Sequence, residues 1–132
     1  MAKIGHTFVI TGRPAIQKNR HKIVRVRGQA RIIKNKAALE WHKEAAAQLA
    51  EQLATTCAGF EPIRKGNMVN VEIWAYCGKG TLPDADNLAC APLDALQKAG
   101  ILENDSSVED LHIYRRRDRD NPRVEVTIYE KL

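Results

Sequence analysis

The chain has 132 residues, of which 44% are hydrophobic and 28% are charged, with a formal net charge of +5 at pH 7. These values are typical of one globular domain and exclude disordered, collagen-like and fibrous proteins. No apolar run approaches the roughly 20 residues needed to cross a bilayer, and the charged start of the chain is unlike a secretory signal. Cys57, Cys77 and Cys90 are widely spaced and form neither a disulfide framework nor a zinc pattern, so we expect a cytoplasmic protein without a membrane partner.

The first part of the chain predicts three short strands and one long helix. Thr7–Thr11 is a β-branched and aromatic run, which is typical of a strand. Lys22–Val26 and Arg31–Ile33 predict two further strands that are exposed, because Lys and Arg alternate along them. From about residue 35 to residue 54 the chain is rich in good helix formers. The apolar stripe predicted for this helix consists of Leu39, His42, Ala46, Leu49 and Leu53, widened by Trp41 and Ala45.

The next segments predict a strand and a second helix. Met68–Cys77 alternates apolar with other residues and gives the clearest strand pattern. Asn87–Ala99 has a helical pattern and ends before Gly100, a residue suited to the position after a helix. Pro92 lies inside this helix and removes one hydrogen bond, so we expect the helix to bend there or to start late. The intervening Gly78–Thr81 lacks the spacing of a phosphate-binding loop and is predicted to be a flexible loop.

Two final strands are predicted over Leu111–Arg115 and Val124–Tyr129. The predicted order is therefore β-β-β-α-β-α-β-β, without an internal repeat. This order predicts an α+β fold, in which the two main helices pack on one face of a small mixed β-sheet. We expect residues 1–132 to form a single domain.

Charge is distributed unevenly along the chain. Residues 1–39 contain ten Lys or Arg and no acid, whereas residues 84–110 contain seven acids and one base, Lys98. The basic arm predicts binding to a polyanion, although a solvated basic face would explain the arm alone. A protein that only coats nucleic acid has little use for concentrated carboxylates, because they repel phosphate. A protein that cuts nucleic acid needs both charges.

The acidic segment contains a motif suited to a hard divalent cation. Asp84 and Asp86 are two residues apart where a loop meets the second helix, and Asp105 follows that helix. Mg²⁺ is usually bound by one or two carboxylates together with substrate phosphates. The alternative is that Asp84 or Asp86 simply caps the helix.

The motif resembles a known family. The segments Pro83-Asp84-Ala85-Asp86-Asn87-Leu88, Leu93-Asp94-Ala95-Leu96, Ala99-Gly100-Ile101-Leu102 and Asn104-Asp105 resemble the RusA family of Holliday junction resolvases. The likeness is dense over residues 83–108 and looser at the loop from Pro14 to Asn19-Arg20 and at the final strand. We therefore identify residues 1–132 as a RusA-like endonuclease domain.

The resemblance implies a Mg²⁺-dependent endodeoxyribonuclease that resolves four-way DNA junctions by paired symmetric nicks as a homodimer. Mn²⁺ is an expected substitute for Mg²⁺, and no small-molecule cofactor is expected. The metal-binding and catalytic aspartates of the family fall on Asp84, Asp86 and Asp105. The residues expected to contact DNA are Arg13, Lys18, Asn19, Arg20, Lys22, Arg25 and Arg27.

Two positions depart from the family pattern. The family commonly has a lysine four residues after the second aspartate, where this chain has Cys90, and its acidic pair reads Asn104-Asp105 here. A thiol is never cationic, so a base from the basic loop, such as Lys18, Arg20 or Lys22, would have to take the place of that lysine. Otherwise the protein would be a catalytically attenuated junction-binding protein. A plain nucleic-acid-binding module is the third hypothesis, and the low aromatic content argues against a single-strand stacking platform.

Overall fold

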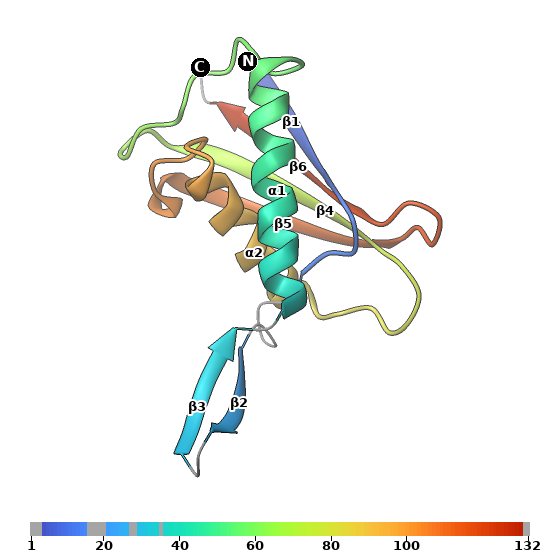
Figure 1. The fold of residues 1–132 in the computed structure, drawn as a ribbon. Helices are drawn as coiled ribbons and strands as arrows, with labels where there is room; N and C mark the ends of the chain where they lie inside the picture. The colour runs from blue at the N-terminus through green and yellow to red at the C-terminus, as the bar shows by residue number, and fades with distance from the viewer. Residues whose placement is uncertain (1–3, 16–20, 27–28, 35, 131–132) are drawn as a thin grey trace.

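The computed structural model describes residues 4–15, 21–26, 29–34 and 36–130, and for the second and third strands it describes the backbone (Figure 1). In chain order the elements are β1 (Ile4–Thr11), β2 (His21–Val26), β3 (Gln29–Lys34), α1 (Lys36–Ala54), β4 (Val69–Cys77), α2 (Ala85–Lys98), the 3₁₀ turn η2 (Asp105–Ser107), β5 (Val108–Arg117) and β6 (Arg123–Glu130). The predicted order of strands and helices is confirmed. None of the described helices has the length and hydrophobicity needed to cross a bilayer.

The main sheet has four strands in the order β1-β6-β4-β5. β4 is parallel to β5 and antiparallel to β6, and β6 is antiparallel to β1. The sheet is therefore mixed, and the two helices lie on the same face of it (Figure 1), which confirms the predicted α+β class. The parallel pair is connected by α2, so the chain leaves one end of the sheet and returns to the other end before β5 begins.

Alternating burial along the strands explains which face the helices cover. β4 shows strict alternation, as its sequence pattern predicts: every second residue from Val69 to Cys77 is buried and the residues between are half-buried. The core includes Phe8, Ile10, Ile73 and Leu96, all fully buried. Burial of side chains of this size stabilises a fold by roughly 1.5–3 kcal/mol each.

The buried face of α1 is narrower than the predicted stripe and lies within it. The buried residues are Trp41, Ala45 and Leu49, which form one row at a spacing of four. Leu39, which we predicted to lie on the stripe, is 48% exposed. The helix is rotated so that its largest apolar side chain, Trp41, faces the sheet.

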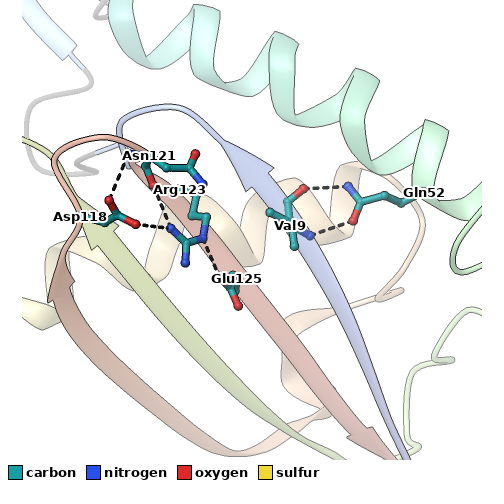
Figure 2. A network of polar contacts seen from close by, with 6 residues as sticks. All are labelled: Val9, Gln52, Asp118, Asn121, Arg123 and Glu125. Carbon is teal, nitrogen blue, oxygen red and sulfur yellow. Dashed lines mark hydrogen bonds and ion pairs between the residues drawn. The ribbon is translucent and has the colours of Figure 1, made fainter.

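Glutamine side chains attach α1 to the edge strand β1. The Val9 N–H donates to Gln52 Oε1 at 2.8 Å, and Gln52 Nε2 donates to the Val9 carbonyl at 2.7 Å (Figure 2). The Thr11 N–H donates to Gln48 Oε1 at 2.8 Å one helical turn earlier. These amides occupy backbone groups of β1 that another strand could otherwise pair with, which is one way in which proteins protect an edge.

Helix α2 starts earlier than predicted and continues through Pro92, which is buried. It ends as predicted, because Gly100 directly follows the C-cap Ala99 and has a φ of +79° that favours glycine.

Strands β2 and β3 pair with each other as a separate antiparallel sheet, and this hairpin lies apart from the four-stranded sheet in Figure 1.

Candidate functional site

Asp84 and Asp86 lie at the amino end of α2. Asp84 occupies the N-cap position with extended backbone, but its side chain makes no capping hydrogen bond, and Asp86 lies in the first turn. Both residues are exposed, and neither carboxylate forms an ion pair or hydrogen bond within the described part of the chain. The alternative explanation of a simple side-chain cap therefore does not describe this structure.

The loop that leads to these aspartates is held by three arginines. Arg117 Nη1 donates to the Gly78 carbonyl, Arg13 Nη2 donates to the Lys79 carbonyl at 3.1 Å, and Arg115 Nη1 donates to the Pro83 carbonyl at 3.1 Å. The guanidinium groups come from the end of β1 and from β5, so segments far apart in the sequence meet here. Two of these carbonyls, those of Gly78 and Lys79, belong to the segment predicted to be a flexible loop, which is thus held by hydrogen bonds.

These arginines also gather positive charge around Cys77, the last residue of β4. Burial raises the pKa of the Cys77 thiol overall, and Arg117, Arg13 and Arg115 act in the opposite direction. None of the three guanidinium groups pairs with a carboxylate among the residues that the structure describes. Three arginines without carboxylate partners in the described residues thus hold the loop that leads to Asp84 and Asp86.

Sequence reasoning did not identify Arg115 or Arg117 as parts of this site. The sequence contains a run of arginines, Arg115 to Arg117, at the end of β5. These arginines lie close to the segment that follows β4 because β5 is parallel to β4, and this pairing is not evident from the sequence alone.

Asp105 lies at the opposite end of the sheet from Asp84 and Asp86. It directly precedes β5, whose first residue Val108 is paired with the start of β4. The 14 residues of α2 rise about 21 Å along the helix axis, so the two ends of the crossover are far apart. In agreement, the described residues contain no group of three or more His, Cys, Asp or Glu side chains that could hold a metal ion. The structure therefore does not bring the three predicted aspartates together within one chain.

The second departure from the family pattern has a structural explanation. Asn104 is the N-cap of η2, and its Oδ1 accepts a hydrogen bond from the Ser106 N–H at 2.8 Å. The asparagine thus fixes the turn that carries Asp105. Asp105 itself is exposed, and its carboxylate has no partner among the described residues.

Asp94 and Cys90, two further positions of α2, have different surroundings. Asp94 Oδ2 lies 3.1 Å from Lys98 Nζ and 3.9 Å from His42 Nε2, so its charge is paired within the protein. Cys90 is exposed and lies one helical turn after Asp86.

Only one of the residues predicted to contact DNA has a described side chain. Arg13 holds the loop before α2, as described above. Lys22 and Arg25 lie on β2, where the backbone alone is described. Lys18, Asn19, Arg20 and Arg27 lie outside the described residues.

The described residues thus form a small α+β fold in which two exposed carboxylates, Asp84 and Asp86, follow a loop held by three arginines. The family described as endodeoxyribonuclease RusA matches residues 12–129, and the chain belongs to this family. A comparison with curated proteins finds no match.

Proposed function

We propose that this protein resolves four-way DNA junctions as a Mg²⁺-dependent, structure-specific endonuclease that acts as a homodimer. The observation that carries the proposal is the pair of exposed carboxylates, Asp84 and Asp86, which lie within the region matched by an endodeoxyribonuclease family. Exposed carboxylates near arginines that bind only backbone carbonyls leave both kinds of charge accessible to a ligand that contains a cation and phosphate.

The two carboxylates suit Mg²⁺, which takes oxygen ligands and is typically held by one or two carboxylates plus substrate phosphates. When bound, the ion supplies activation of water and neutralisation of charge on the phosphoryl oxygens. Asp84 and Asp86 hold the ion, and Mn²⁺ can replace it. The arginines that fix the Gly78–Pro83 loop keep both aspartates in a defined position.

The separation of Asp105 from Asp84 and Asp86 suggests why the protein would act as a dimer, namely that each metal site takes carboxylates from both copies. If Asp105 belongs to the same metal site, we assign it to a second copy, because within one chain it follows the far end of α2, whose 14 residues rise about 21 Å. A two-fold axis then builds two identical sites, each with carboxylates from both copies. Two symmetric sites match the two nicks that resolve a four-way junction. Phosphate contacts from the basic arm supply affinity.

The test of the activity is a nicking assay on a synthetic four-way junction, with linear duplex of the same sequence as the control. We expect paired nicks in the junction in Mg²⁺ or Mn²⁺, no nicks in EDTA and no nicks in the duplex. Junction binding without nicking in either metal would instead identify an attenuated junction-binding protein.

The shared site has a separate test. Copies carrying Asp86→Asn and copies carrying Asp105→Asn are co-expressed with different tags, and the mixed dimer is purified through both tags. If each site combines two copies, one site of the mixed dimer has all wild-type aspartates, and we expect single nicks without resolution. If each site uses one copy, the mixed dimer contains no intact site and is inactive like both parents.

A further inference from the structure

The amino half of α2 supplies no cation to the site. Between Asp84 and Gln97 the chain has no lysine or arginine, and the first base, Lys98, is paired with Asp94. Cleavage of a phosphodiester builds negative charge on the phosphoryl oxygens, and a fixed donor near these oxygens is worth about 10²–10³ in rate. The donor must therefore come from another element.

We propose that Arg115 of β5 is this donor and contacts the scissile phosphate, in the role that Cys90 cannot fill. The inference rests on the proposed function and names a further catalytic residue for it. Arg115 Nη1 donates to the carbonyl of Pro83, the residue that directly precedes Asp84. Its guanidinium group is thus hydrogen-bonded to the backbone at the residue before Asp84, the first of the two aspartates.

The register of the sheet explains why Arg115 reaches this place. Arg115 is opposite Ala75, which is buried on the helix-covered face, so its side chain lies on the same face as α2. The neighbouring residue Arg116 lies on the other face, with its guanidinium carbon 5.0 Å from the centre of the Trp74 ring. Arg115 therefore lies on the face covered by α2, whereas its neighbour Arg116 lies on the opposite face of the sheet, against Trp74.

Arg115 also keeps the chemical capacity that the role requires. A guanidinium group has five N–H donors, and the bond to Pro83 uses one nitrogen. The residue is exposed and has no carboxylate partner in the described part of the chain. The remaining donors match the paired oxygens of a phosphate group.

The other two arginines of the cluster are less well placed. Arg117 and Arg13 bind the carbonyls of Gly78 and Lys79, which are five or more residues before Asp84. They hold the start of the loop, whereas Arg115 holds its end. We therefore assign positioning to Arg13 and Arg117 and contact with the phosphate to Arg115.

In the proposed step, the oxygen of water forms a bond to phosphorus and the bond from phosphorus to the 3′ oxygen breaks. The bonding electron pair leaves with the 3′ oxygen, which ends as a hydroxyl after taking one proton of the water. The other proton is released when the new 5′-phosphate ionises. Arg115 donates hydrogen bonds to the non-bridging oxygens throughout and exchanges no proton, because a guanidinium group stays protonated in proteins.

The experiment measures single-turnover nicking and junction affinity of the full-length protein in Mg²⁺. For Arg115→Gln we expect a nicking rate lower by about 10²–10³ with little change in affinity. The conservative Arg115→Lys keeps the charge and is expected to retain more activity than Arg115→Gln. Arg116→Gln is the matched control, since it removes the same charge from the next residue of the strand and is expected to nick at nearly the wild-type rate.

Rescue separates contact with phosphate from support of the loop. Cys90→Lys places an ammonium group one turn after Asp86 but restores no bond to the Pro83 carbonyl. In the Arg115→Gln background we expect Cys90→Lys to raise the nicking rate at least about tenfold, a part of the 10²–10³ attributed to the donor. An unchanged rate in Arg115→Gln, or a slow Arg115→Gln that Cys90→Lys does not rescue, would overturn the inference. Wild-type nicking in the same assay shows whether the proposed function itself holds.

Discussion

Carboxylates and arginines meet at two places near the same end of the sheet, with opposite outcomes. At the turn between β5 and β6, Arg123 Nη1 lies 2.8 Å from Asp118 Oδ2 and Arg123 Nε lies 2.7 Å from Glu125 Oε2 (Figure 2). In the loop before α2, the arginines bind backbone carbonyls, and Asp84 and Asp86 have no partner among the described residues. We call the first set (Asp118, Arg123 and Glu125) closed, because its charged groups pair with one another. We call the second set (Asp84, Asp86 and the arginines of the loop) open, because its carboxylates have no such partner in the described residues.

The closed set shows what a structural role looks like. The hydrogen bond from Arg123 lowers the pKa of Asp118, and the hydrogen bond with Glu125 raises the pKa of Arg123. The Asn121 N–H also donates to Asp118 Oδ1 at 3.2 Å, so the same carboxylate fixes the turn. Such groups stabilise the fold and have little remaining capacity for a ligand. The open set lacks such pairs among the described residues, and it is the set to which we assign the proposed metal ion and phosphate.

The largest expected effect is a loss of nicking activity when an aspartate of the open set is replaced, compared with no loss when one of the closed set is replaced. Asp86→Asn removes one metal ligand, so we expect junction nicking to fall to the EDTA background while affinity for the junction stays the same or increases. Affinity is retained because the substitution removes a charge that repels phosphate. Nicking is measured on a synthetic four-way junction, and affinity by gel shift.

The matched control for Asp86→Asn is Asp118→Asn, which makes the same chemical change in the closed network. We expect Asp118→Asn to keep the wild-type nicking rate. Equal losses in the two variants, or full activity of Asp86→Asn, would contradict the assignment of Asp86 to the metal site.

The second expected effect concerns affinity and salt. Neutralising Lys18, Arg20 and Lys22 together is expected to weaken junction binding. The slope of log K against log salt should become shallower by about 0.9 for each phosphate that the variant no longer neutralises. Binding is measured from low to moderate salt, with Arg123→Gln as a control that removes a paired charge elsewhere. An unchanged slope would show that this part of the basic arm does not contact DNA.

The smallest expected effect is on stability and its dependence on pH. Because the pKa of Asp118 is lowered in the folded protein, its ionised form stabilises the fold above the unfolded pKa. This contribution disappears as the pH falls through the folded pKa, below the ordinary value of 3.8. We therefore expect Asp118→Asn to have a slightly lower Tm than the wild type near pH 7 and the same Tm at the acid end of a pH series. A difference in Tm that persists there would argue against the ion pair as its cause.

Local patterns in the chain determined most of the elements. Period-two alternation identified β4, and the glycine at position 100 correctly marked the end of α2. The apolar pattern of α1 was less decisive, because several rows of alanine and leucine compete for the buried face. Packing of the large Trp41 ring against the sheet selected one row and left Leu39 exposed.

The candidate site divides in the same way. The spacing of Asp84, Asp86 and Asp105 is visible in the sequence, since it belongs to contiguous segments around one helix. Three features required the tertiary structure: the free carboxylates, the distance across α2 and the arginines of β5. They depend on how β4 and β5 pair and on which face each side chain takes, and both arise from contacts between residues far apart in the chain. Sequence spacing determines which groups are present, whereas strand register and the helix crossover determine which of them meet.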